Sequence, residues 1–96
     1  MTRPLPPGAV KYKETKRFTA DTVPAGLTRH HATKSGVWGL ICVDQGTLDV
    51  DYGDPVLESM ALKAGQHTVV APEEVHKVTL HPNTEFHVEF YSAADA

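Results

Sequence analysis

Short apolar or alternating stretches, separated by turn signals, constrain the fold of this chain more than any other feature of its sequence. The stretch 37–43 is apolar on both faces, and Leu48, Val50 and Tyr52 alternate with polar residues in the stretch that follows. Such patterns are typical of β-strands, because successive side chains of a strand point to opposite faces. Seven or eight such segments divide the chain, with turn signals between them. The sequence therefore predicts an all-β sandwich or barrel.

The other segments fit a single domain over residues 1–96. Strands are predicted at 11–20, 67–72, 76–80 and 85–91, with a strand or irregular edge at 57–62. Hairpin turns are predicted at Gln45-Gly46 and at Pro82-Asn83, because glycine, proline and asparagine favour tight turns. The proline-rich segment 1–10 is expected to form an extended arm, and 92–96 a polar tail.

Charge, hydropathy and cysteine content exclude several classes of protein. The net charge is -3 and the nine lysines and arginines are dispersed, so nucleic acid is not expected as a partner. The chain lacks an apolar run of about 18 residues, so no membrane contact is expected. Cys42 is the only cysteine. It is predicted to be a small buried hydrophobe rather than a reactive thiol, and a reducing, cytoplasmic setting is expected.

His76 is the first candidate for a site residue. It shares one face of its predicted strand with Val78 and Leu80, so its imidazole is expected to point inward with these apolar side chains. A buried imidazole needs a polar partner. That partner is either a metal or carboxylate, or a backbone carbonyl or water, and the strand pattern leaves both open.

Motif spacing adds a resemblance to a known family. Gly65, Pro72 and His76 stand at the spacing of the second sequence motif of the cupins. More closely, the blocks "HATKSGVWG", "VDQGTLDV", "APEEVHKV" and "FHVEFY" resemble a cupin family related to tellurite resistance, the YeaR/TehB-like domain. The resemblance covers residues 5–91. It implies a cupin-type double-stranded β-helix (jelly-roll) barrel that often holds a metal through histidines.

The resemblance selects His31 as the partner of His76, because His31 precedes Ala-Thr-Lys as the family pattern requires. Its neighbour His30 would then face solvent or a partner subunit, since adjacent strand residues point to opposite faces. The usual first cupin motif, with two histidines and a glutamate on one strand, is not matched: Trp38 and Gly39 occupy the region of that glutamate. Lys34 would bring a positive charge to the pocket mouth or be solvated.

The last strand leaves two arrangements open. If its apolar residues face the core, His87 and Glu89 lie on the outer face and the site has two protein ligands. If its polar residues face a wet cavity, both could join His31 and His76. A two-residue turn at Pro82-Asn83 would place Glu89 beside His76, whereas a three-residue loop would turn it away. Imidazole and carboxylate ligands together suit a divalent Zn, Fe, Mn or Ni ion.

Three functions are compatible with these residues. The favoured hypothesis is a metal-binding protein related to tellurite resistance that acts in a stress response on a small molecule or oxyanion. The second is a metal-dependent enzyme of the dioxygenase or isomerase type. The third is a non-catalytic module that binds or senses a small ligand. A homodimer is also expected, with the arm 3–10 crossing to the partner.

Overall fold

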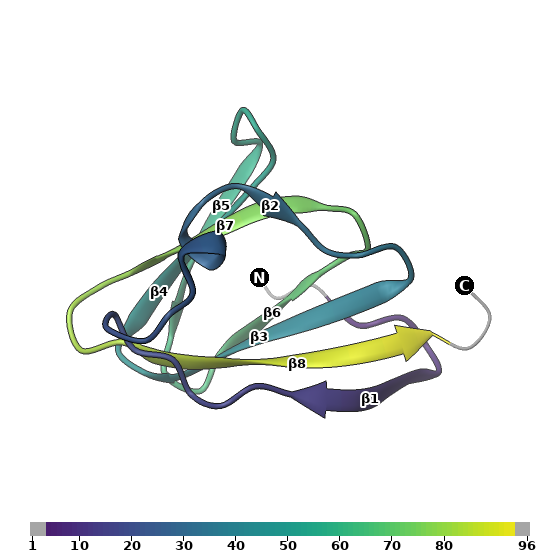
Figure 1. The fold of residues 1–96 in the computed structure, drawn as a ribbon, viewed down its shortest axis with the longest axis horizontal. Helices are drawn as coiled ribbons and strands as arrows, with labels where there is room; N and C mark the ends of the chain where they lie inside the picture. The colour runs from purple at the N-terminus through teal and green to yellow at the C-terminus, as the bar shows by residue number, and fades with distance from the viewer. Residues whose placement is uncertain (1–3, 94–96) are drawn as a thin grey trace.

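Two four-stranded antiparallel sheets face each other (Figure 1). The computed structural model describes residues 4–93. The strands are β1 (Ala9–Glu14), β2 (His31–Ala32), β3 (Val37–Gln45), β4 (Thr47–Tyr52), β5 (Glu58–Lys63), β6 (His67–Val70), β7 (Val75–Leu80) and β8 (Glu85–Ala93). One sheet has the order β1-β8-β3-β6 and the other β2-β7-β4-β5. Within the described range the one helical element is the 3-10 helix η1 (Ala25–Thr28). The all-β prediction is confirmed, as two separate sheets rather than one closed barrel.

Most connections carry the chain from one sheet to the other. Of the links between consecutive strands from β1 to β8, β4–β5 is the one that stays within a sheet. The two predicted hairpins are therefore wrong: β3 pairs with β6 and β8, and β7 pairs with β2 and β4. Turns do occur at Gly46 and Asn83, both with positive φ, but each turn passes the chain across the sandwich. The residues of a turn therefore predict that the chain reverses, but they do not predict which sheet the next strand joins.

The two crossing turns pack against each other at one end of the sandwich. The side-chain amide of Gln45 donates to the carbonyl of Asn83 at 2.9 Å. Buried Thr84 accepts a hydrogen bond from the backbone N–H of Thr47 through its hydroxyl, which also donates to the Thr47 carbonyl. A Cβ on Gly46 would lie 2.9 Å from the Cα of Thr84. Glycine at 46 is thus required by its backbone angle and by its close neighbour.

The core lies between the two sheets. Leu48 and Val50 of β4 are fully buried, as their alternation predicts, and meet Val78 of β7 and Phe86 of β8 in one cluster. Phe86 also packs against Phe18, with ring centroids 5.6 Å apart. The apolar residues of β8 therefore face inward, which decides between the two arrangements that the sequence left open.

The predicted N-terminal arm becomes an edge strand over part of its length. Ala9 and Val10 belong to β1, which pairs with β8 of the same chain. Residues 1–3 and 94–96, which include the start of the predicted arm and the end of the predicted tail, lie outside the described residues. Ser92 and Ala93 extend β8. The homodimer stays a prediction.

Candidate functional site

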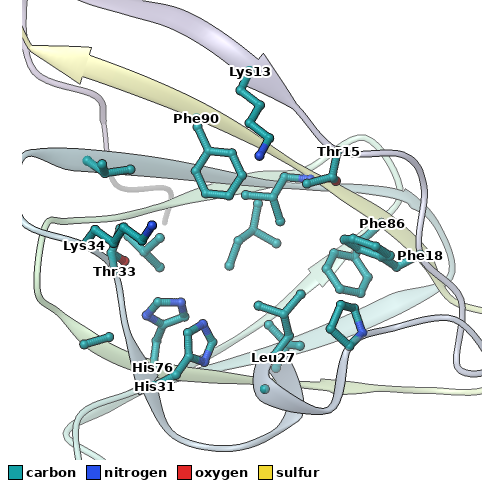
Figure 2. Close-up of a pocket in the computed structure, with 18 of the residues that line it drawn as sticks. Lys13, Thr15, Phe18, Leu27, His31, Thr33, Lys34, His76, Phe86 and Phe90 are labelled. Atoms are coloured by element: carbon teal, nitrogen blue, oxygen red, sulfur yellow. The ribbon is translucent and has the colours of Figure 1, made fainter.

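A cavity of about 690 Å³ opens between the two sheets (Figure 2). Its inner part is apolar, with Phe18, Ile41, Val78, Phe86 and Val88 among the lining residues. Its polar residues are Tyr12, Lys13, Thr15, His31, Thr33, Lys34 and His76. This volume is that of a pocket for a small molecule. The cavity joins an apolar surface to a small number of polar groups, which is the usual composition of such pockets.

His31 and His76 lie side by side in this cavity. They are direct partners in the β2–β7 ladder, so both side chains project from the same face of the sheet. Their ring centroids are 4.1 Å apart and the rings meet edge to face. His76 is 4% exposed and His31 is half-buried. The structure thus brings together the two histidines that the sequence analysis paired.

Each imidazole is oriented by its own strand. The Nδ1 atom of His31 lies 3.0 Å from the carbonyl oxygen of Arg29, and the Nδ1 atom of His76 lies 2.8 Å from that of Glu74. A carbonyl only accepts, so Nδ1 carries the proton in both rings. In the neutral form the lone pair then resides on Nε2. Nδ1–H donation to a carbonyl is the usual arrangement of a metal-ligating histidine.

The residues that line the cavity favour a negatively charged ligand. Lys13 enters from β1 and Lys34 from the turn before β3 (Figure 2). Among the lining residues within the range 4–93, none is a carboxylate. Thr33 adds a buried hydroxyl that has no hydrogen-bond partner within the same range. A buried hydroxyl without a partner indicates a place where a ligand or water can bind.

His87 and Glu89 lie on the other face of their sheet. Phe86, Val88 and Phe90 of β8 line the cavity, so the residues between them point away from it. The four predicted metal ligands are therefore divided into two pairs. His31 and His76 face the cavity, and His87 and Glu89 do not. Neither of the two registers considered for His76 and Glu89 occurs, because β7 and β8 belong to different sheets.

The outer pair is held by side-chain contacts. His87 Nδ1 lies 2.7 Å from Oδ2 of Asp44, and Nε2 lies 3.4 Å from Oε2 of Glu89. Burial lowers the pKa of His87, but the hydrogen bond and charge of Asp44, with help from Glu89 and Glu14, raise it above its ordinary value. A hydrogen bond from Tyr91 is the main cause that lowers the pKa of Glu89.

Sequence reasoning assigned Cys42 to the apolar interior and missed its neighbours. Cys42 is half-buried and is the direct ladder partner of His87. Burial, followed by the charges of Glu89 and Asp44, raises the pKa of its thiol to about 12. Its neighbours Ile41 and Val43 are buried in the core, so Cys42 points to the outer face. All three residues are apolar, and the residue order alone gave no signal of this.

The remaining histidines lie away from the cavity. His30 is 3.9 Å from a carboxylate oxygen of Asp54, and His81 is 2.9 Å from one of Asp49. His67 begins β6 and is exposed. None of the three lines the cavity within the described range. In that range there is also no helix long and apolar enough to cross a bilayer.

Comparisons with known proteins agree with this architecture. The family model described as the TehB-like domain matches residues 13–88. A crystal structure of a protein from Escherichia coli K12 has a TM-score of 0.89 at 22% identity, and the match covers 98% of this chain and 100% of that chain. TehB from Haemophilus influenzae has a TM-score of 0.82 at 26% identity, and the match covers 91% of this chain and 32% of that chain. This chain thus spans about a third of that TehB. No curated protein sequence matches the chain.

Proposed function

The chain belongs to the TehB-like domain family, and on this premise we propose that it is a tellurite-resistance-related binding domain whose cavity takes a small anion. One observation carries the proposal: the cavity holds two imidazoles and two lysines and no carboxylate among the described lining residues, in a chain whose net charge is -3. Positive groups in a cleft with apolar walls raise the local concentration of an anion.

Two kinds of anion fit this cavity. A bare oxyanion would contact only the polar end, where His31, Thr33 and Lys34 lie (Figure 2). An anionic metabolite with an apolar body would also cover Phe86 and Phe90. The first matches the expected role in a stress response to oxyanions, which the relation to tellurite resistance supports.

A divalent metal ion fits the same polar end. His31 and His76 would hold it, because both rings donate Nδ1–H to a carbonyl and carry the lone pair on Nε2. Zn, Fe, Mn or Ni is compatible with imidazole ligands. The metal would supply a Lewis acid that binds the oxygen atoms of an anion. His87 and Glu89 are not part of this proposal, since they lie on the far face of their sheet.

The finer fold assignment is part of the same proposal. We infer a cupin-type jelly roll that is open between its two sheets. Eight strands in the orders 1-8-3-6 and 2-7-4-5 support this, because two interlocked Greek keys give a double-sheet jelly roll.

Calorimetric titration of the untagged full chain with tellurite, phosphate and benzoate tests the anion site. We expect binding of at least one of the three, weakened at least tenfold in His76→Ala and several-fold in Lys34→Gln. His81→Ala serves as the control, because His81 is an exposed histidine outside the cavity. Equal affinity in His76→Ala and the unaltered protein would refute the assignment of the cavity.

Elemental analysis of the same untagged protein tests the metal. We expect His31→Ala and His76→Ala each to contain one divalent metal ion per chain fewer than the unaltered protein. A metal content in His76→Ala equal to that of the unaltered protein would exclude the histidine pair as the ligand set. Anion binding that persists after removal of metal by a chelator would assign the cavity to the protein's own positive groups.

A small-molecule enzyme is the second candidate function. It is favoured by the position of the histidine pair at the edge of an apolar cavity of about 690 Å³, where a bound metal would face an organic substrate. Turnover by the metal-loaded chain that disappears in His76→Ala would support the enzyme. Ligand binding without turnover would support the binding domain.

A further inference from the structure

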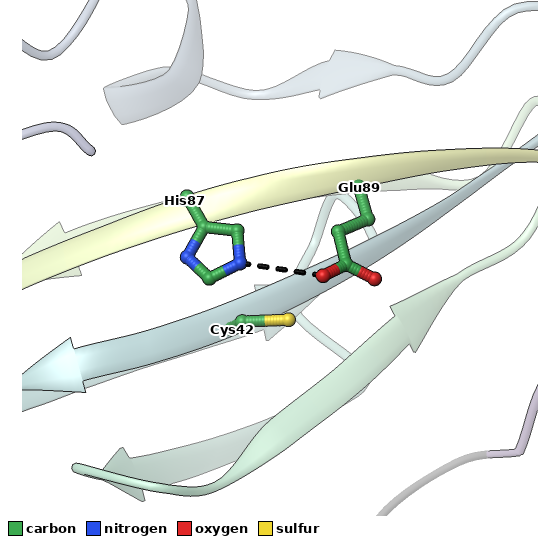
Figure 3. Close-up of side chains that lie close together, drawn as sticks. All are labelled: Cys42, His87 and Glu89. Carbon is green, nitrogen blue, oxygen red and sulfur yellow. Dashed lines mark hydrogen bonds and ion pairs between the residues drawn. The ribbon is translucent and has the colours of Figure 1, made fainter. Parts of the chain in front are cut away.

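A second group of metal-ligating side chains lies on the outer face of the β1-β8-β3-β6 sheet. It consists of Cys42 from β3 and His87 and Glu89 from β8 (Figure 3). One ligand atom from each residue lies within 4.8 Å of the other two. The ladder produces this cluster, because Cys42 pairs directly with His87, and Leu40, two residues before Cys42, pairs with Glu89. Thiol, imidazole and carboxylate therefore meet on one surface without a loop or a second sheet.

The imidazole of His87 is already turned toward the cluster. Its Nδ1 atom lies 2.7 Å from Asp44, and Arg17 holds the same carboxylate oxygen at 3.6 Å. This contact leaves Nε2 to face Glu89, whose Oε2 atom is 3.4 Å away. A carboxylate on the second nitrogen of a ligating histidine fixes the ring and makes it a stronger ligand.

The carboxylate of Glu89 is held in a similar way. The hydroxyl of Tyr91 donates to Oε1 of Glu89 at 2.7 Å, so Oε2 is the oxygen directed to His87. Three different donor atoms thus converge, and two of them are oriented by neighbouring side chains. The alternative to a metal site is a network of hydrogen bonds on the surface. Such a network needs only the histidine and the acidic residues, and it gives no role to the thiol beside them.

We propose that Cys42, His87 and Glu89 bind one Zn²⁺ ion, with a fourth position open to solvent. Sulfur, nitrogen and oxygen ligands at about 2.0–2.3 Å from Zn²⁺ lie about 3.5 Å from one another in a tetrahedral site. The separation of Nε2 and Oε2 already has this size, at 3.4 Å. The sulfur lies within 4.8 Å of the other two ligand atoms, so it would have to move closer to them by up to about 1 Å. The site is distinct from the cavity and independent of the function proposed for it.

Zn²⁺ would take the place of protons in this cluster. Burial and the nearby carboxylates raise the pKa of the Cys42 thiol to about 12, so binding must release the thiol proton. The ion also occupies the position of an Nε2 proton between His87 and Glu89. Affinity should therefore increase with pH. The charged and titratable groups around the cluster are Lys11 and Glu14 of β1, Asp44 of β3, Tyr91 of β8 and His67 of β6, which pairs with Cys42 from the other side.

Titration of the untagged, metal-free full chain with Co²⁺ tests the proposal. Cobalt replaces zinc in such sites and gives an intense near-ultraviolet band when a thiolate binds it. Because Cys42 is the only cysteine, this band can arise only from the proposed site. We expect the intensity of the band at saturation to correspond to one thiolate-bound Co²⁺ per chain, and we expect the band to disappear when Zn²⁺ is added.

Matched variants separate this site from the cavity. Cys42→Ser should abolish the band, and His87→Ala should weaken Co²⁺ binding at least tenfold. Asp44→Asn should keep the band and weaken binding about tenfold, as expected for a residue that orients the ring. His76→Ala, in the cavity, should leave the band unchanged. Circular dichroism would check that each variant is folded.

A second measurement needs no variant. Zn²⁺ should slow the alkylation of Cys42 by iodoacetamide at least tenfold in the unaltered protein. Two results would overturn the proposal. One is the absence of a thiolate band in the folded protein at millimolar Co²⁺. The other is a Co²⁺ affinity of His87→Ala, read from this band, that lies within twofold of the unaltered chain.

Discussion

The two faces of β8 carry different chemistry on one strand. Its inner face presents Phe86 and Val88 to the core and cavity, and its outer face presents His87 and Glu89 to a polar cluster. The side chains of the inner face exclude water and pack against their neighbours. The outer face works by charge and by side-chain hydrogen bonds. Polar residues one position from the pocket lining therefore need not belong to the pocket.

The polar groups on the two faces are also oriented by different means. In the cavity, His31 and His76 are each held by a backbone carbonyl two residues earlier. On the outer face, His87 is held by a side chain from the neighbouring strand, Asp44. A ring fixed by its own backbone keeps its direction when neighbours are mutated, whereas a ring fixed by a carboxylate depends on that one residue and on pH.

The largest expected effect comes from a substitution on the inner face. Phe86 is fully buried and packs on Phe18, so Phe86→Ala should lower the free energy of unfolding by about 3–5 kcal/mol. The adjacent outer-face change His87→Ala is the control and should cost about 1 kcal/mol or less. Urea unfolding at about pH 8 measures both. Equal losses would mean that the two faces are not distinct in packing.

The crossing turn that places β3 and β4 in different sheets gives the second effect. Gly46 has φ of 75° and an added Cβ would meet the backbone of Thr84 at 2.9 Å. Gly46→Ala should therefore cost about 2–3 kcal/mol. Gly36→Ala is the matched control, because Gly36 has φ of 78° but nothing within 4 Å of an added Cβ. It should cost about 1 kcal/mol. A similar loss in both, measured by urea unfolding, would show that close packing of the two turns contributes little.

This contrast also explains what the sequence could and could not predict. Alternation along a strand is local, so the buried set of β4 and the two sides of β8 are readable from the residue order. The sheet that a strand joins is not determined locally. Gly46 and Asn83 mark turns, but strands distant in sequence decide whether the next strand pairs with the preceding one or crosses to the other sheet.

The candidate sites also depend on contacts between residues that are distant in the sequence. The pairing of His31 with His76 was reached through resemblance, because the two residues are far apart in the chain and nothing local joins them. The neighbourhood of Cys42 was missed, because an apolar stretch such as 37–43 does not tell which of its side chains meet a polar strand on the outer face. In both cases the decisive contact is a ladder partner in a different part of the sequence.

The third effect is a pH dependence confined to the outer face. The folded-state pKa of His87 is raised above its ordinary value by Asp44, against the opposing effect of burial. The stability that this gives is fully present below the unfolded pKa and is lost as pH rises through the folded pKa. Asp44→Asn should lower the pKa of His87, measured by NMR of the ring protons.

The same variant makes a prediction about stability. Asp44→Asn should destabilise the protein more at about pH 5.5 than at about pH 8.5. The lower pH stays above the range in which Glu89 titrates, because Glu89 has a lowered pKa. A destabilisation that is the same at both pH values would show that the Asp44 carboxylate does not favour protonation of His87.

The smallest effect concerns Tyr91. Its hydroxyl donates to Glu89 at 2.7 Å and is the main cause that lowers the pKa of that carboxyl. Tyr91→Phe removes the donor but keeps the ring, so the free energy of unfolding should fall by only about 0.5–1 kcal/mol at neutral pH. The pKa of Glu89 should rise toward its ordinary value, measured by carboxyl carbon NMR. Tyr12→Phe is the control, because Tyr12 is an exposed residue of β1 that lines the cavity, and it should leave this pKa unchanged. If Tyr91→Phe also leaves it unchanged, His87 and Lys11 alone hold the carboxylate in its charged form, and the outer face is oriented by charge rather than by hydrogen bonds.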